Sequence, residues 1–243
     1  MITRDLIGTN LLITQDRGSS FNLDTVLLSD FVRIPKGTKH IYDFGTGNGA
    51  IMLYLSRKTN AHITGIEIQD SRFVLAIHNI KQNELTHQLS VIKADIKTFI
   101  VPQLADIIVS NPPFFKVNEN TYKSKTEEAM IARHEVLLDL KTLIEKMSKS
   151  LKNGGLMFLI HRPDRLDEIF ELIKENKMTV KRLRFVHPTL DSSPNHVLIE
   201  AAKKGKQQVK IEPPLILYIN KHEYGKELID IYGGRSYATT TTR

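Results

Sequence analysis

Ser110-Asn111-Pro112-Pro113-Phe114-Phe115 closes an apolar run that covers residues 105–109. The run predicts a buried strand, because it is short and almost entirely apolar. Two consecutive prolines can continue neither a strand nor a helix, and they hold the backbone rigid. We therefore expect the Asn111 amide, fixed carbonyl groups and two exposed rings at the carboxyl end of a strand, where open α/β sheets bind ligands. Such a set suits a planar group that carries an amino nitrogen.

Strands and helices alternate on both sides of this segment. Strands are predicted at 40–44, 63–68, 89–94, 105–109, 156–160, 179–186, 197–202 and 215–219. Helices are predicted at 24–33, 50–57, from Asp70 onward, 136–151, from Pro163 onward and 226–232, with Asn153-Gly154-Gly155 ending the fourth. This rhythm predicts an α/β fold: a doubly wound, Rossmann-like parallel sheet with helices on both faces.

The same pattern divides the chain into four parts. We expect an N-terminal lead-in with a helix at 1–34, a ligand-binding core at 35–205, a C-terminal extension at 206–232 and a disordered tail at 233–243. The polar segment 116–130 follows the proline pair directly, so we expect a mobile loop there, beside the site.

Composition narrows the possible environments and partners. The 243 residues include no cysteine, which excludes disulfides, thiolate metal sites and a cysteine nucleophile. The N-terminus lacks the features of a signal peptide, and no window approaches 18 apolar residues, so we expect a cytoplasmic protein without a membrane span. A net charge of +7 is compatible with a nucleic-acid partner, although a lysine-rich composition alone would also produce it.

A glycine turn and two acids predict a nucleoside pocket. Asp43-Phe44-Gly45-Thr46-Gly47-Asn48-Gly49 joins a strand to a helix whose free N–H groups favour an anion. Its glycine spacing differs from the dinucleotide fingerprint. Glu67 ends the next strand, where an acid can hold ribose hydroxyls, and Asp95 ends the third, where it can accept from an adenine amine. S-adenosylmethionine fits this set better than a nicotinamide dinucleotide, while a structural turn and solvated strand ends remain the alternatives.

At these residues the chain resembles the class I S-adenosylmethionine-dependent methyltransferases, and the Asn-Pro-Pro-Phe motif resembles that of enzymes that methylate amino groups. A closer resemblance, over almost the whole chain, is to the YfiC-like tRNA adenine-N6 methyltransferases, which act on adenosine 37 beside the anticodon. The matching segments are 21–28, 43–49, 67–69, 111–115, 131–135, 162–166 and 182–188.

The resemblance implies methyl transfer from S-adenosylmethionine to the N6 amine of an adenosine in tRNA, with no metal. The cofactor-binding residues would be Asp43, Gly45, Thr46, Gly47, Asn48, Gly49, Glu67, Ile68, Asp95, Ile96 and Asn111. The catalytic residues would be Asn111, Pro112, Pro113 and Phe114. The substrate-binding residues would be Phe114, Phe115, Arg182, Arg184, Lys203 and Lys204.

Other assignments remain open at this point. A protein glutamine-N5 methyltransferase would use the same clamp for a carboxamide, and a non-catalytic RNA-binding module could retain the fold. Arg182 and Arg184 share one face of a predicted strand, which is either a phosphate-binding surface or a solvated basic face. Arg133, His134 and Glu135 form either part of the site or an internal brace. The sequence leaves the oligomeric state open.

Overall fold

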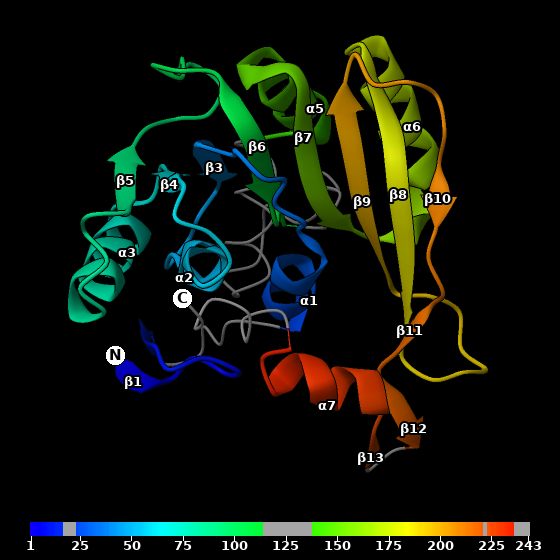
Figure 1. The fold of residues 1–243 in the computed structure, drawn as a ribbon, viewed down its shortest axis with the longest axis horizontal. Coiled ribbons are helices and arrows are strands. Elements are labelled where there is room, and N and C mark those ends of the chain that lie inside the picture. The colour runs from blue at the N-terminus through cyan, green and yellow to red at the C-terminus, as the bar shows by residue number, and fades with distance from the viewer. Residues whose placement is uncertain (17–22, 114–137, 221–222, 236–243) are drawn as a thin grey trace, which may run out of the picture.

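The structure is a computed structural model that describes residues 1–16, 23–113, 138–220 and 223–235. Its centre is a nine-stranded sheet with the order β10-β8-β9-β7-β6-β3-β4-β5, in which β11 also pairs with β8 (Figure 1). The strands are β3 (His40–Phe44), β4 (His62–Glu67), β5 (Leu89–Lys93), β6 (Ala105–Ser110), β7 (Leu151–His161), β8 (Met178–His187), β9 (His196–Lys203), β10 (Lys210–Ile211) and β11 (Leu215–Ile216). Only β9 runs against its neighbours among the described strands of this sheet.

Helices cover both faces of the sheet, which confirms the doubly wound α/β prediction (Figure 1). The helices are α1 (Leu23–Phe31), α2 (Ala50–Ser56), α3 (Asp70–Gln82), α5 (Leu140–Ser150), α6 (Leu166–Glu175) and α7 (Lys226–Tyr232). Side chains alternate between two cores: in β6, Ile107 and Val109 pack toward α1 and α2, whereas Ile108 packs toward α5 and α6. The strand is apolar throughout because both of its faces are buried.

Two smaller sheets lie outside the nine-stranded sheet, one near each end of the chain. The hairpin of β1 (Ile2–Asp5) and β2 (Leu12–Gln15) lies against α3, and β12 (Tyr218–Asn220) pairs with β13 (Glu223–Tyr224) before α7. A 3₁₀ turn, η2 (Pro163–Arg165), leads into α6. None of the helices in the described ranges is long and apolar enough to span a bilayer.

The bounds of α5 and β7 differ from the predicted ones, in the region where Asn153-Gly154-Gly155 was expected to end the helix. Helix α5 begins at Leu140, because the Asp139 side chain caps it by accepting a hydrogen bond from the Thr142 N–H (2.9 Å). It ends at Ser150, and β7 begins immediately with Leu151, which pairs with Ala105. The prediction of a helix to 151 and a strand from 156 was therefore wrong. Residues 153–155 lie inside β7 at an irregularity of its register, where Gly154 has a φ of +80°.

Two other boundaries also move. Helix α1 covers Leu23–Phe31 and not the predicted 24–33, and the Asp24 side chain is turned toward β9, where its Oδ1 lies 3.3 Å from His196 Nε2. The single strand predicted at 215–219 is divided between β11 and β12, which belong to different sheets. Both differences come from contacts between distant segments.

Candidate active site

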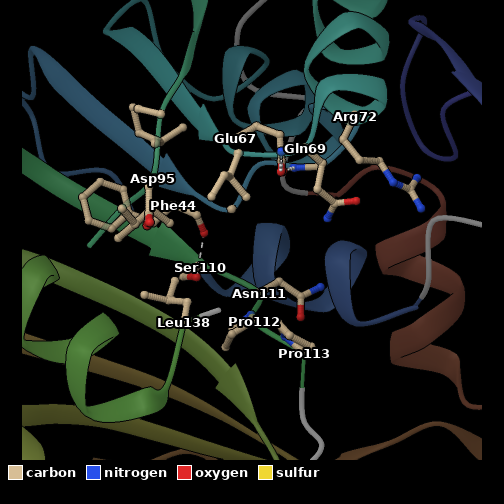
Figure 2. A pocket seen from close by; sticks show the side chains of 16 residues that line it. Phe44, Glu67, Gln69, Arg72, Asp95, Ser110, Asn111, Pro112, Pro113 and Leu138 are labelled. Carbon is tan, nitrogen blue, oxygen red and sulfur yellow. Dashed lines mark hydrogen bonds between the residues drawn. The ribbon is translucent and has the colours of Figure 1, made fainter. Parts of the chain in front are cut away.

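A pocket lies at the carboxyl ends of β3, β4, β5 and β6 (Figure 2). The chain leaves β3 for β4 on one side, and β6 pairs with the other side of β3, so the pocket stands where the strand order reverses. The residues that line it are Phe44, Gly45, Gly47, Ile66, Glu67, Ile68, Gln69, Arg72, Ala94, Asp95, Ile96, Ser110, Asn111, Pro112, Pro113 and Leu138.

The glycine turn forms one wall of the pocket. Gly45 and Gly47 have φ values of +76° and +58°, and a Cβ atom at either position would meet nothing within 4 Å. Their backbone conformation requires glycine, and the space beside them is open to a ligand. The N–H groups of Gly45 and Thr46 both donate to the Ile66 carbonyl, and that of Gly49 donates to the Thr46 carbonyl. Most N–H groups of the turn itself are therefore occupied, because the turn is hydrogen-bonded to β4 and to itself.

Glu67 holds the turn in place from β4. Its Oε2 accepts a hydrogen bond from the Gly47 N–H (2.8 Å), and its Oε1 accepts one from the Gln69 N–H (2.8 Å). The residue is 5% exposed. Each carboxylate oxygen can accept a second hydrogen bond, so the group can still receive hydroxyl donors from the pocket. Glu67 is thus placed both to fix the turn and to bind a ligand.

Asp43 lies behind the turn and does not line the pocket. It is fully buried, its Oδ2 accepts from the Thr46 hydroxyl (2.6 Å), and its Oδ1 has no partner among the described residues. Burial raises the pKa of this carboxyl to about 7; the Thr46 hydrogen bond opposes that shift and the Glu67 charge adds to it. Of the predicted cofactor-binding residues, Asp43, Thr46, Asn48 and Gly49 stand outside the lining, whereas the other seven belong to it.

The opposite wall is apolar and ends in an acid. Phe44, Ile68, Ala94 and Ile96 supply flat or branched carbon surface. Asp95 follows β5, and its Oδ1 accepts from the Lys97 N–H (2.9 Å). Apolar walls with a carboxylate at one end suit an adenine ring with its exocyclic amine, because the ring is desolvated while the amine retains an acceptor.

The Asn-Pro-Pro segment lies at the mouth of the pocket, at the end of β6 (Figure 2). Ser110 ties it to β3 by donating from its hydroxyl to the Phe44 carbonyl (2.7 Å). The Asn111 Nδ2 donates to the Thr25 hydroxyl oxygen (3.3 Å), and Asn111 Oδ1 has no hydrogen-bond partner in the described part of the chain. Phe114 and Phe115, like the 131–135 segment, lie outside the described residues.

The structure gives the two predicted RNA-contacting arginines partners inside the protein. Arg182 Nε lies 2.9 Å from Glu200, and its guanidinium carbon lies 3.8 Å from the centre of the Phe31 ring. Arg184 Nη2 lies 2.5 Å from Glu227. The side chains are only 16% and 11% exposed. The expected exposed basic face is therefore wrong for these two residues, because carboxylates from neighbouring elements neutralise it.

Lys203 and Lys204, which were predicted to bind the substrate, lie at the end of the sheet opposite the pocket. Strand β9 is antiparallel to β7, and its Ala202 pairs with Leu156, five residues before the carboxyl end of β7 at His161. Lys203 and Lys204 therefore lie roughly 20 Å along the strand from the pocket edge. The Lys203 ammonium donates to the carbonyls of Ser148 and Leu151 (2.7 and 2.8 Å). Lys204 is exposed but far from Asn111 along the sheet.

Several lining residues escaped the sequence-based prediction. Gln69 and Arg72 open α3 directly after Glu67, so their place at the carboxyl end of β4 was a usable signal. Ser110 directly precedes the predicted motif. Leu138 carries no such signal, because only tertiary packing brings it beside Pro112. No group of three or more histidine and acidic side chains in the described ranges is arranged to hold a metal ion.

The strand order, the glycine turn and the pocket define a class I S-adenosylmethionine-dependent methyltransferase. The chain belongs to the methyltransferase small domain family, whose sequence pattern matches residues 15–181. The fold is similar to that of a predicted O-methyltransferase from Agrobacterium tumefaciens, with a TM-score of 0.66 and 20% identity over 88% of this chain and 97% of the other.

The sequence relatives have a more specific name. A Flavobacteriaceae protein is 30% identical over 73% of this chain and 74% of its own length, and a Parabacteroides distasonis protein is 27% identical over 86% of each. A third, from Tolumonas auensis, is 28% identical over 89% of this chain and 90% of its own length. Each bears the name tRNA1(Val) (adenine(37)-N6)-methyltransferase.

Proposed function

We propose that this protein transfers a methyl group from S-adenosylmethionine to the N6 amine of an adenosine in tRNA, at position 37 beside the anticodon. The observation that carries the proposal is Asn111, which stands at the mouth of a nucleoside-shaped pocket with a side-chain oxygen that has no partner in the described ranges. The shared name of the relatives supports the substrate and the position. We place the reaction in the cytoplasm, together with its tRNA.

The residues present fit the cofactor. Gly45 and Gly47 leave open space beside the backbone, and Glu67 retains acceptor capacity for ribose hydroxyls. Asp95 would accept from the adenine amine between the walls formed by Ile68 and Ile96. When bound, S-adenosylmethionine supplies an electrophilic methyl group on a sulfonium centre.

Asn111 and Pro112 would activate the substrate amine. The adenine N6 lone pair is delocalised into the ring, which makes the amine a poor nucleophile. In the proposed complex Asn111 Oδ1 and the Pro112 carbonyl accept the two N6 hydrogens, which draws the lone pair out of the ring. Acceptors that are fixed in advance stabilise the positive charge that develops on nitrogen, as an oxyanion hole stabilises negative charge. The product ammonium is acidic, so its proton needs no strong base.

The adenine must leave its stack to reach this site. A base in the anticodon loop is only partly paired, so its extrusion costs little. Phe114 follows the proline pair directly, and we assign it to stacking on the extruded base, a contact worth about 1–3 kcal/mol. This assignment follows from its place in the motif.

The direct test uses radiolabelled S-adenosylmethionine and total tRNA from a strain that lacks this protein. Nucleoside digestion should show the label in N6-methyladenosine, and mapping should place it at position 37. Label in another nucleoside would contradict the atom, and label in a protein fraction without label in tRNA would favour glutamine-N5 methylation. No label anywhere, with cofactor binding intact, would favour a non-catalytic module.

Asn111→Ala should lower kcat by about 10²–10³-fold, the usual effect of removing one preorganised hydrogen-bonding group from a developing charge. Cofactor affinity, measured by calorimetry, and the thermal transition should change little. The matched control is Asn195→Ala, an exposed amide before β9 that does not line the pocket. Near-normal turnover by a folded Asn111→Ala protein would refute the proposed role.

A further inference from the structure

One matching segment has no role in the mechanism described above. Residues 21–28 are part of the family resemblance, yet none of the described ones lines the pocket. Helix α1 nevertheless touches the reaction centre at one atom: the Thr25 hydroxyl oxygen accepts the hydrogen bond from Asn111 Nδ2 at 3.3 Å. Thr25 is 8% exposed, so water competes weakly for this contact.

An asparagine amide has one accepting end and one donating end of nearly the same shape. If the Asn111 amide turned by half a rotation, it would present an NH₂ group to the substrate amine, which needs an acceptor. Hydrogen-bond partners alone decide between the two orientations. A partner that receives Nδ2 on the protein side leaves Oδ1 for the pocket, and Thr25 is the described residue in that position.

The helix that carries Thr25 is anchored at both ends. At its start, Asp24 Oδ1 lies 3.3 Å from His196 Nε2 on β9. At its end, the Lys58 ammonium donates to the carbonyls of Ser29, Asp30 and Val32 at 2.9, 3.1 and 2.6 Å. Seven of the nine residues of α1 are buried. A partner on such a helix has a fixed position, which a partner on a loose loop would lack.

We propose that Thr25 is a positioning residue that holds the Asn111 amide in its productive orientation. It contacts neither substrate nor cofactor in this scheme and acts only through Asn111. The inference rests on the proposed role of Asn111 as the acceptor for the substrate amine. It assigns a role to the 21–28 segment: Thr25 on α1 fixes the orientation of the Asn111 side-chain amide at the end of β6.

The test compares Thr25→Val, which removes the hydroxyl and keeps the shape, with Thr25→Ser, which keeps the hydroxyl. Thr25→Val should lower kcat about five- to tenfold, the effect expected from one hydrogen bond, and leave KM for tRNA within twofold. Thr25→Ser should restore at least half of the wild-type kcat. The matched control is Thr64→Val, a threonine of similar burial (7%) on β4 that should leave kcat unchanged. A Thr25→Val kcat within twofold of wild type would overturn the proposal.

Adding Thr25→Val to the Asn111→Asp variant distinguishes an effect on the orientation of the amide from an effect on packing. The two oxygens of a carboxylate are equivalent, so Asn111→Asp has no donating end to misplace. Single-turnover rates should therefore fall less than twofold when Thr25→Val is added to Asn111→Asp. An equal fall in both backgrounds would mean that Thr25 acts by packing alone, and it would refute the role in orientation.

A spectroscopic measurement keeps the inference separate from the identity of the substrate. The side-chain amide of Asn111 should give one sharp pair of ¹⁵N–¹H signals in the wild type and shifted or exchange-broadened signals in Thr25→Val. Thr64→Val should leave that pair unchanged. An unchanged Asn111 pair in Thr25→Val would refute the contact. If tRNA accepts no methyl group but the signals respond as expected, the substrate assignment fails and the amide contact stands.

Discussion

Two acids close together at the pocket have different tasks, and the difference comes from their hydrogen bonds. Glu67 receives two backbone N–H groups, at Gly47 and Gln69, and lines the pocket. Asp43 receives one hydroxyl, has a buried oxygen without a hydrogen-bond partner in the described ranges, and stands behind the turn. The first can therefore still receive a hydroxyl donor from the pocket. The second carries a charge at a cost, because burial raises its pKa to about 7.

Glu67→Gln should weaken S-adenosylmethionine binding by about 10–100-fold, since hydrogen bonds to a charged group contribute about 1.5–3 kcal/mol. Glutamine can accept one of the two backbone N–H groups but not both. Calorimetry measures the affinity, and cofactor-dependent thermal stabilisation should shrink in parallel. Glu171→Gln, on the exposed side of α6, is the control and should bind as the wild type does. Unchanged affinity in Glu67→Gln would contradict its role in the pocket.

The buried Asp43 predicts a pH-dependent stability. Its folded-state pKa, about 7, lies above the usual value of 3.8, so between these values the folded state binds the proton that the unfolded state has released. The free energy of unfolding should therefore fall from pH about 4 to pH about 7. Urea titrations of Asp43→Asn should lack this part of the slope.

Asp106→Asn provides the comparison of opposite sign. Burial raises the pKa of Asp106, but hydrogen bonds from Lys152 and from the N–H groups of Lys39 and His40 outweigh burial and lower it. Its effect should appear only below pH about 4, where the carboxylate of the folded protein becomes protonated. Equal slopes for wild type and Asp43→Asn above that pH would contradict the Asp43 prediction.

At the scale of elements, α3 joins the N-terminal hairpin to the glycine turn. Asn79 is fully buried; its Oδ1 accepts from the Thr14 N–H, and its Nδ2 donates to the carbonyls of Thr14 and Asn48 (2.8, 2.9 and 2.8 Å). One turn later, the Asn83 amide makes the same pair of bonds with Leu12 at 2.8 Å each. The two amides pair with the edge of β2 as a neighbouring strand would, so the N-terminal hairpin and the glycine turn share one anchor.

Asn79→Ala should lower the free energy of unfolding by about 2–4 kcal/mol, because it leaves several buried polar groups without partners. It should also weaken cofactor binding, since Asn48 in the turn loses its tether. Asn83→Ala, which removes the exposed bonds to Leu12 and one bond to the Asn79 carbonyl (2.7 Å), should cost about 1 kcal/mol and leave the affinity unchanged. Urea unfolding and calorimetry measure the two effects. Equal costs for the two variants would show that the link to the turn contributes nothing.

At the scale of the whole molecule, charged side chains join α1 to β8, β9 and the C-terminal extension. Glu200, 1% exposed on β9, lies between Arg33 and Arg182, with Nε to oxygen distances of 2.9 Å to each. Nearby, Arg235 lies 2.9 Å from Asp30 and 2.8 Å from Glu227. These carboxylates neutralise most of the cations at this face, so the face contributes little to the net charge of +7.

Glu200→Gln should lower the free energy of unfolding by about 2–4 kcal/mol, since two guanidinium groups lose a buried counter-charge. Glu145→Gln breaks an exposed pair with Lys149 in α5 and should leave the free energy of unfolding almost unchanged. Filter binding should show the same tRNA affinity for Glu200→Gln and wild type. A large loss of tRNA affinity without a loss of stability would instead place this network at the RNA surface.

Local patterns in the sequence were sufficient to predict the fold class of this protein and part of its pocket. The apolar runs, the glycine turn and the proline pair predicted the parallel strands and the doubly wound class, and seven of the eleven residues predicted to bind the cofactor line the pocket. These features can be predicted from short stretches of sequence. A continuous apolar run indicates a strand that is buried on both faces, glycine permits a positive φ, and proline ends a strand or helix.

Only the tertiary structure decided which charges are used up and which side chains meet across the sheet. The sequence predicts that Arg182 and Arg184 bind RNA, whereas the structure pairs both with carboxylates from distant segments. The register of β9 places Lys203 at the end of the sheet opposite the pocket. Thr25 reaches Asn111 across 86 positions of sequence. A periodic pattern reveals the face on which a side chain lies, but the partner on that face comes from another element, and only the packed sheet brings the two together.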